Sequence, residues 1–225
     1  MSKSIREDEV NMRYSGATLK FYYGAMGCGK TRKLQGDYYS KKEDGFEVIV
    51  IKPTIDTKGD NKTLARDGGM VETTFLVGKE DNIYFEIANY LLEHNLDFIL
   101  VDEAQFLTEK QVDELTEIVD IFGIEIMCYG LRTDFLGKLF EGSKRLFEVA
   151  DKAEGINRQC SCGNLKIYNM RVENGKAVFV GEQVAIDGVD ATYRSVCRSC
   201  YKKEKRRVLS RKNVSGRLEP NDIEI

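Results

Sequence analysis

Short apolar runs alternate with amphipathic stretches over the first two thirds of the chain. Four runs have the length of buried strands, namely Leu19–Tyr23, Phe46–Ile51, Phe98–Val101 and Ile124–Tyr129. Between them the spacing of apolar residues predicts helices over 29–42, 83–92 and 109–122. Thr108 and Gln111 have the spacing of a capping box and are expected to open the last of these helices. Strands and helices that alternate in this way predict an α/β protein, with a parallel sheet between layers of helices.

The pattern changes after Asp151, where helical periodicity fades. Asn174-Gly175 is expected to form a hairpin turn, and residues 156–201 are too few to sustain a hydrophobic core alone. We therefore expect a main domain over 18–154 and a small lobe over 155–202. A flexible lead (1–17) and a flexible polar tail (203–225) complete the division. Residues 54–69, rich in Asp, Lys and Gly, are expected to form a mobile functional loop.

Composition adds little to this picture. The chain has 225 residues, 42% of them hydrophobic, and a formal net charge of −3, which gives no general attraction to nucleic acid or anionic membranes. No apolar run reaches the ~18 residues that span a bilayer, and the first residues do not resemble a signal peptide. We expect a cytoplasmic protein that binds neither a membrane nor nucleic acid.

A glycine-rich loop follows the first predicted strand. Residues 24–31 match the phosphate-loop pattern GxxxxGK[ST], and glycines there let backbone amides turn toward phosphate oxygens. Lys30 would pair with the terminal phosphates of a nucleotide, and the Thr31 hydroxyl would bind Mg²⁺. The candidate phosphate-binding residues are Gly24, Ala25, Met26, Gly27, Cys28, Gly29, Lys30 and Thr31.

Two carboxylates end the third predicted strand, in the segment FILVDEAQF (98–106). Since successive strand side chains point to opposite faces, Asp102 and Glu103 are expected to have different roles. Asp102 would help to hold Mg²⁺ through water, while Glu103 would accept a proton from an acceptor hydroxyl. Both roles fit phosphoryl transfer.

Four of the six cysteines form two close pairs, Cys160 with Cys162 and Cys197 with Cys200. Four thiolates are the ligand number of a closed zinc site, and a disulfide between cysteines two residues apart would be strained. We expect a structural Zn²⁺ bound by all four. Because 34 residues separate the pairs, against about 15 to 20 in compact ribbons, the segment 182–193 could be a loop that closes over a ligand.

The motifs together resemble the zinc-containing thymidine kinase family. The phosphate loop, Lys52-Pro53-x-x-Asp56, DEAQF, YGLRTDFLGKLFEGSKRLFEVAD and YRSVCRSCY occur in family order over residues 18–202. The resemblance implies a P-loop NTPase-like kinase domain (18–154) with a zinc-ribbon-like lobe that carries a lasso loop. It also implies transfer of the ATP γ-phosphate to the 5′-hydroxyl of thymidine, in nucleotide salvage for DNA synthesis, by a homotetramer subject to feedback binding of thymidine triphosphate.

Residue roles follow from the same resemblance. Glu103 would be the base, and Asp56 would lie near the magnesium ion, with Thr31 and Asp102. The nucleoside pocket would be formed by Met26, Phe106, Leu131, Phe135, Phe140 and Tyr193. The chain departs from the family at Lys58, where arginine is frequent, at the first cysteine pair, and at Asn169, where a threonine often approaches the base.

A second interpretation remains open, in which the chain is a nucleic-acid-dependent ATPase with a zinc ribbon. DEAQ is superficially similar to a helicase motif, although 225 residues leave no room for a second motor domain. Deoxyuridine is a further possible substrate, because one methyl group changes affinity by only ~1 to 3 kcal/mol.

Overall fold

The computed structural model describes residues 16–54, 62–64, 70–181, 183 and 191–214. By its internal contacts the chain divides into two units. The first comprises residues 1–23, 29–131 and 140–156, and the second comprises residues 24–28, 132–139 and 157–225. The second unit therefore includes two short segments that the sequence pattern assigned to the main domain.

The first unit is built on a six-stranded parallel sheet with the strand order β5-β2-β6-β7-β1-β8. This confirms the predicted α/β fold. The strands are β1 (Leu19–Gly24), β2 (Val48–Pro53), β5 (Phe75–Val77), β6 (Phe98–Val101), β7 (Glu125–Leu131) and β8 (Lys152–Gly155).

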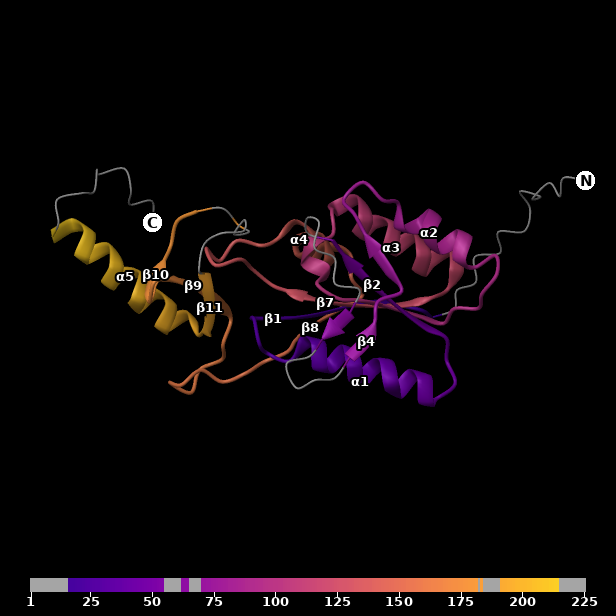
Figure 1. Cartoon of the computed structure of the whole chain (residues 1–225), viewed down its shortest axis with the longest axis horizontal. Helices are drawn as coiled ribbons and strands as arrows, with labels where there is room; N and C mark the ends of the chain where they lie inside the picture. Colours follow the sequence, from indigo (N-terminus) through magenta and orange to yellow (C-terminus); the bar gives the residue numbers. More distant parts are fainter. Residues whose placement is uncertain (1–15, 55–61, 65–69, 182, 184–190, 215–225) are drawn as a thin grey trace, which may run out of the picture. The chain divides into compact units, whose positions relative to one another are not determined.

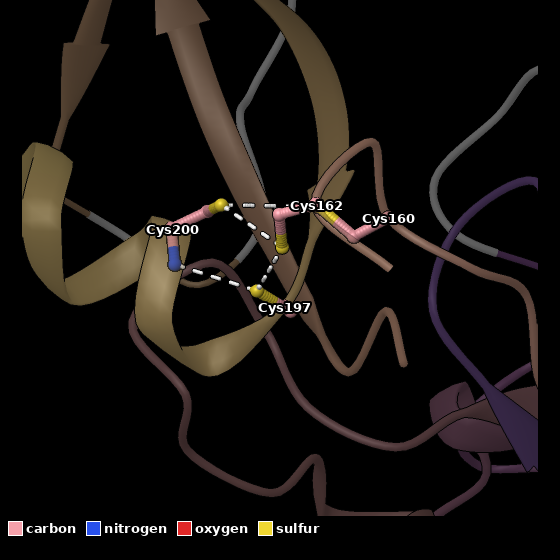
Figure 2. Close-up of side chains that lie close together, drawn as sticks. All are labelled: Cys160, Cys162, Cys197 and Cys200. Carbon is pink, nitrogen blue, oxygen red and sulfur yellow. Dashed lines mark hydrogen bonds between the residues drawn. The ribbon is translucent and has the colours of Figure 1, made fainter. Parts of the chain in front are cut away.

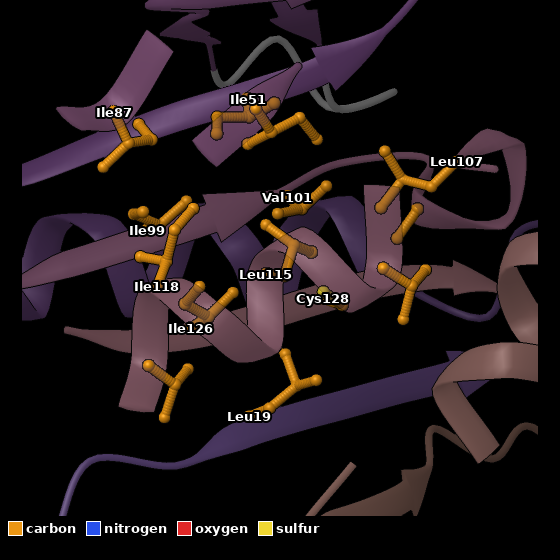
Figure 3. Packing of buried hydrophobic residues seen from close by; sticks show 14 of the residues in the cluster. Leu19, Ile51, Ile87, Ile99, Val101, Leu107, Leu115, Ile118, Ile126 and Cys128 are labelled. Atoms are coloured by element: carbon orange, nitrogen blue, oxygen red, sulfur yellow. The ribbon is translucent and has the colours of Figure 1, made fainter. Parts of the chain in front are cut away.

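Helices cover both faces of this sheet (Figure 1). Helix α1 (Lys30–Glu43) lies on one face, and α2 (Ile83–Tyr90), α3 (Glu109–Phe122) and α4 (Glu141–Val149) lie on the other. Strand side chains alternate between the two faces, so apolar residues at every strand position build two separate cores. Figure 3 shows the core under α2 and α3, to which β6 contributes Ile99 and Val101. Phe98 and Leu100 belong to the core on the other face, together with Leu34 of α1.

The capping box predicted at the start of α3 is confirmed. The Thr108 hydroxyl accepts the Gln111 N–H at 3.2 Å, and the Gln111 side chain accepts the Thr108 N–H at 3.1 Å. Gly123 ends the helix at φ 68°, a conformation that glycine adopts without steric cost.

Four strands of the first unit, β3 (Lys62–Leu64), β4 (Met70–Glu72), β5 and β8, were not predicted. β5 and β8 are short, and the polar sequence KAEG of β8 gives no apolar signal because the strand lies at the sheet edge. β3 pairs antiparallel with β4, within and just after the stretch in which we expected only a loop.

The second unit contains a three-stranded antiparallel sheet with the order β10-β9-β11. Its strands are β9 (Tyr168–Glu173), β10 (Lys176–Val178) and β11 (Ala191–Val196). Asn174 and Gly175 join β9 to β10 with φ of 48° and 71°, which confirms the predicted hairpin turn.

Helix α5 (Arg198–Val214) follows β11. The sequence pattern predicted a flexible polar tail over 203–225, because this segment is rich in charged residues. Lys, Glu, Arg and Leu are nevertheless good helix formers, and no glycine or proline interrupts them before Gly216. Of the helices in the described part of the chain, none combines the length and the apolar character that crossing a membrane requires.

Candidate functional site

The glycines of the phosphate-loop pattern adopt conformations that other residues avoid. Gly27 has φ 68° and Gly29 has φ 105°. Gly29 is the N-cap of α1, so Lys30 and Thr31 lie in the first turn of the helix. A helix N-terminus presents backbone amides and a partial positive charge, which together favour an anion. Residues 29–31 belong to the first unit and residues 24–28 to the second.

The two carboxylates after β6 have different surroundings. The Asp102 N–H donates to the Ile51 carbonyl at 2.9 Å, so the pairing of β6 with β2 continues to Asp102. Because side chains two positions apart point to the same face, Asp102 lies on the face of Leu100, which is the face covered by α1. The Asp102 side chain is buried. Glu103 ends the strand at φ 50° and is half-buried. The two side chains therefore lie in different environments, and their different roles stay a prediction.

Gln105 fixes the position of the Glu103 side chain. Its Nε2 donates to Glu103 Oε2 at 2.6 Å, and its Oε1 accepts the Leu131 N–H at 2.8 Å. A Cβ atom on Gly130 would lie only 3.0 Å from the Gln105 backbone nitrogen, so the glycine permits this close approach. Gln105 was part of the DEAQF motif, but nothing in the sequence indicated that it contacts Glu103.

Three predicted nucleoside-pocket residues of the first unit lie near Glu103 in the fold. Phe106 belongs to the short helix η2 (Ala104–Phe106), and its ring packs edge-on against Phe140, with centroids 5.5 Å apart. The Leu131 carbonyl accepts a hydrogen bond from Ser143 Oγ at 2.6 Å. Gln105 thus links the Glu103 carboxylate to the main chain of Leu131, while Phe106, which follows Gln105 in the chain, packs on Phe140.

The other predicted pocket residues belong to the second unit. Phe135 is buried, and the guanidinium of Arg171 lies 5.4 Å from its ring centroid. Tyr193 lies directly opposite Arg171 in the pairing of β11 with β9. Arg171 thus packs on Phe135 and is the strand partner of Tyr193, although no sequence signal identified it. Met26 is held through its main chain by Asn169 and Ser195.

All four paired cysteines come together in the second unit, as Figure 2 shows. Their sulfurs lie within 4.8 Å of one another, and three of the pairs are separated by 3.4 to 3.9 Å. Four sulfurs at about 2.3 Å from a tetrahedral zinc ion would be about 3.8 Å apart. The cluster therefore fits a zinc ion. It includes Cys160, so the unusual CxC spacing does not prevent this residue from taking part.

The electrostatics of the cluster also favour a cation. Hydrogen bonds from the backbone amides of Cys162 and Cys197 lower the pKa of the Cys160 thiol to about 6. Hydrogen bonds with the neighbouring sulfurs, that of Cys162 first, raise the pKa of Cys200 to about 12. Without a cation the four thiols thus cannot all ionise at neutral pH, whereas a divalent ion would compensate their charge.

Several predicted residues lie outside the described part of the chain. They are Asp56, Lys58 and most of the predicted lasso loop, at positions 182 and 184–190.

Comparisons with known proteins agree with the resemblance. The family model described as "Thymidine kinase" matches residues 17–201. A thymidine kinase of Legionella pneumophila (strain Paris) is 41% identical over 189 residues, covering 83% of this chain and 90% of the relative. Thymidine kinases of Vibrio vulnificus and Pasteurella multocida are 43% and 42% identical, over 83% and 84% of this chain and 97% and 98% of the relatives.

Among solved structures, the Pif1 helicase of Candida albicans matches with a TM-score of 0.38 and 16% identity, over 63% of this chain and 36% of the helicase. We draw no conclusion from a likeness at this level.

Proposed function

Since the chain belongs to the thymidine kinase family, we propose that it transfers the γ-phosphoryl group of ATP to the 5′-hydroxyl of thymidine. The observation that carries this proposal is the Glu103 carboxylate, held by Gln105 at the end of β6. In the same unit, Lys30 begins the helix that follows the phosphate loop. The strand order places only β7 between β6 and β1, so the acid group and the cation follow the carboxyl ends of two strands of one parallel sheet, which is the arrangement that a nucleoside kinase needs.

Each group has a separate task in this proposal. Lys30 and the first amides of α1 bind the triphosphate and stabilise the charge that develops on it. Glu103 accepts the proton of the attacking hydroxyl, a contribution of typically ~10²- to 10⁴-fold in rate. Thr31, Asp102 and Asp56 are assigned to Mg²⁺, which when bound with ATP neutralises part of the phosphate charge.

The remaining assignments rest on the resemblance. Met26, Phe106, Leu131, Phe135, Phe140 and Tyr193 are assigned to the nucleoside, and the segment 182–193 to closure over it. The four cysteines are assigned to structural Zn²⁺, because a site filled by four thiolates leaves no open position for catalysis. Assembly as a homotetramer and feedback binding of thymidine triphosphate are expected on the same ground.

Replacing Glu103 tests the proposed base. Glu103→Gln keeps the size of the side chain and removes its ability to accept a proton. We expect the ATP dissociation constant to change less than about twofold and kcat to fall by ~10²-fold or more. Glu109→Gln, six residues along at an exposed position, is the matched control. A near-normal kcat in Glu103→Gln would refute the role of Glu103 as base.

The substrate is tested with a panel of free nucleosides and radiolabelled ATP. We expect phosphorylation of thymidine, with deoxyuridine separated from it by no more than the ~1 to 3 kcal/mol of a methyl group. A parallel assay supplies polynucleotide in place of nucleoside. ATP hydrolysis stimulated only by polynucleotide would contradict the proposed reaction and favour a nucleic-acid-dependent ATPase.

A further inference from the structure

The two faces of the sheet in the second unit contact different parts of the chain. In the pairing of β9 with β11, Asn169 lies opposite Ser195, and Met170 lies opposite Arg194. Met170 and Val196 belong to the buried cluster that includes Cys160, Cys197 and Tyr201. Since successive strand residues point to opposite faces, Asn169 and Ser195 lie on the face away from the cysteines.

That second face holds the main chain of the phosphate loop. Asn169 Oδ1 accepts the Met26 N–H at 2.7 Å, and Ser195 Oγ donates to the Met26 carbonyl. Arg158 Nη1 donates to the carbonyl of the next residue, Gly27, at 3.1 Å. Both backbone polar groups of Met26 are therefore bound by side chains of residues more than 140 positions away in the sequence.

Asn169 joins this loop to a second segment of the same unit. Its Nδ2 donates to the Thr133 carbonyl at 3.0 Å, and its side chain is only 2% exposed. Because the amide oxygen and nitrogen are each bonded to main chain, Asn169 is suited to fixing two loops against each other. Loss of the side chain would leave the Met26 N–H and the buried Thr133 carbonyl without these partners, which is unfavourable for polar groups shielded from water.

The loop itself supplies little rigidity. It contains Gly24, Gly27 and Gly29 within six residues, and glycine loses more conformational entropy on ordering than any other residue. A ligand that must order such a loop binds more weakly, whereas a loop ordered beforehand binds at lower cost. Side-chain bonds to Met26 and Gly27 provide that order from outside the loop.

We propose that Asn169 and Ser195 are positioning residues that hold the Met26 peptide and thereby set the affinity of the phosphate loop for ATP. The inference rests on the proposed function in so far as it takes ATP to be the ligand of the loop. It assigns the asparagine that departs from the family pattern to the loop and not to the nucleoside.

The test compares variants of the full-length, metal-loaded protein. Asn169→Ala removes two hydrogen bonds, and we expect the ATP dissociation constant measured by calorimetry without nucleoside to rise ~10- to 100-fold. Ser195→Ala removes one bond, and we expect a rise of ~3- to 10-fold. Ser195→Thr keeps the hydroxyl and should restore most of the affinity. Thr192→Ala, on the same strand with its hydroxyl on the Val172 carbonyl, is the matched control.

Hydrogen–deuterium exchange of the peptide that spans residues 21–34 gives a second readout, independent of any nucleotide. We expect faster exchange in Asn169→Ala and Ser195→Ala than in the wild type and in Thr192→Ala. If Asn169→Ala does not fold, Ser195→Ala and Ser195→Thr carry the test, because both leave the bonds of Asn169 to Met26 and Thr133 in place.

Unchanged ATP affinity together with unchanged exchange would overturn the inference. A rise in the thymidine KM alone, with ATP affinity intact, would overturn it as well and assign Asn169 to the nucleoside. Failure of the proposed function is recognised separately with Lys30→Ala. If the loop does not bind ATP, this variant has the same ATP affinity as the wild type. The exchange rates still report on the Met26 contacts in that case, because they are measured without nucleotide.

Discussion

Glu103 shows how a single backbone conformation separates two adjacent carboxylates. Its φ of 50° and ψ of 37° lie in the left-handed region, which costs a residue other than glycine ~1 to 3 kcal/mol. This turn ends the alternation of β6 and begins η2, so Asp102 stays with the strand and Glu103 leaves it. The sequence predicted different roles from strand alternation, but it could not predict the left-handed turn that produces them.

At the same scale, Gln105→Glu tests how Glu103 is held. The substitution places a second carboxylate against Oε2 of Glu103 and removes the donor that stabilised it. Two facing carboxylates share a proton, so activity that needs the ionised base should be lost at higher pH than in the wild type. We expect kcat at pH 7 to fall by ~10-fold or more.

The measurement is the dependence of kcat on pH between 5 and 9. Gln105→Met, of similar length and without charge, removes only the donor, so it should move the acidic limb of the profile less than Gln105→Glu does. If kcat falls at the same acidic pH in both variants and in the wild type, Gln105 does not act through the Glu103 carboxylate.

Among the elements, α4 packs against η2 at a distance that only glycine allows. A Cβ atom on Gly142 would lie 2.6 Å from the Ala104 carbonyl oxygen and 2.7 Å from that of Leu107. These are backbone atoms, which cannot move aside as a flexible side chain can. The close approach lets Ser143 reach the Leu131 carbonyl, so α4 helps to fix the end of β7.

Gly142→Ala should therefore destabilise the protein, by ~1 to 3 kcal/mol. Gly36→Ala is the matched control, because nothing lies within 4 Å of a Cβ at that position of α1. There alanine should stabilise the helix by up to about 1 kcal/mol. Urea denaturation measures the change in the free energy of unfolding in both variants. If the two substitutions change it in the same direction, Gly142 is not needed for the close packing of α4 on η2.

Elements with strong local signals were predictable, and those defined by tertiary contacts were not. The Thr108 capping box and the Asn174-Gly175 turn each depend on a few neighbouring residues, and both are confirmed. β8 depends on pairing with β1, 132 residues away in the sequence, and its polar residues carry no pattern. The cysteine cluster was predictable because thiolate chemistry restricts its partners. The contacts of Gln105 and Asn169 were not, since amides bond equally well to many groups.

For the whole molecule, the second unit has a small buried core. Its cluster consists of Cys160, Met170, Ala177, Val196, Cys197 and Tyr201, with partly buried neighbours. Apolar burial on this scale contributes little to folding, while structural zinc sites contribute ~10 to 16 kcal/mol in isolated fingers. The proposed metal would thus account for most of the stability of this unit.

Chelation of the metal should accordingly unfold the second unit before the first. We expect an earlier thermal transition after treatment with a strong chelator, restored by adding Zn²⁺, together with the loss of about one zinc per chain. Cys200→Ser should reproduce the effect, and Ser199→Ala, its exposed neighbour on α5, should not. Unchanged melting after complete removal of the metal would show that the cysteines do not stabilise the unit.

The alternation within β11 limits which changes in chain length this protein tolerates. Deleting one residue between Thr192 and Ser195 would exchange the inward and outward sides of the strand, since its side-chain period is two. Insertions between Val178 and Ala191 leave the strand register intact, and lengthening a connection costs little entropy. Among related sequences, insertions and deletions should therefore occur between Val178 and Ala191. They should be absent from β11, although the strand begins directly after this connection.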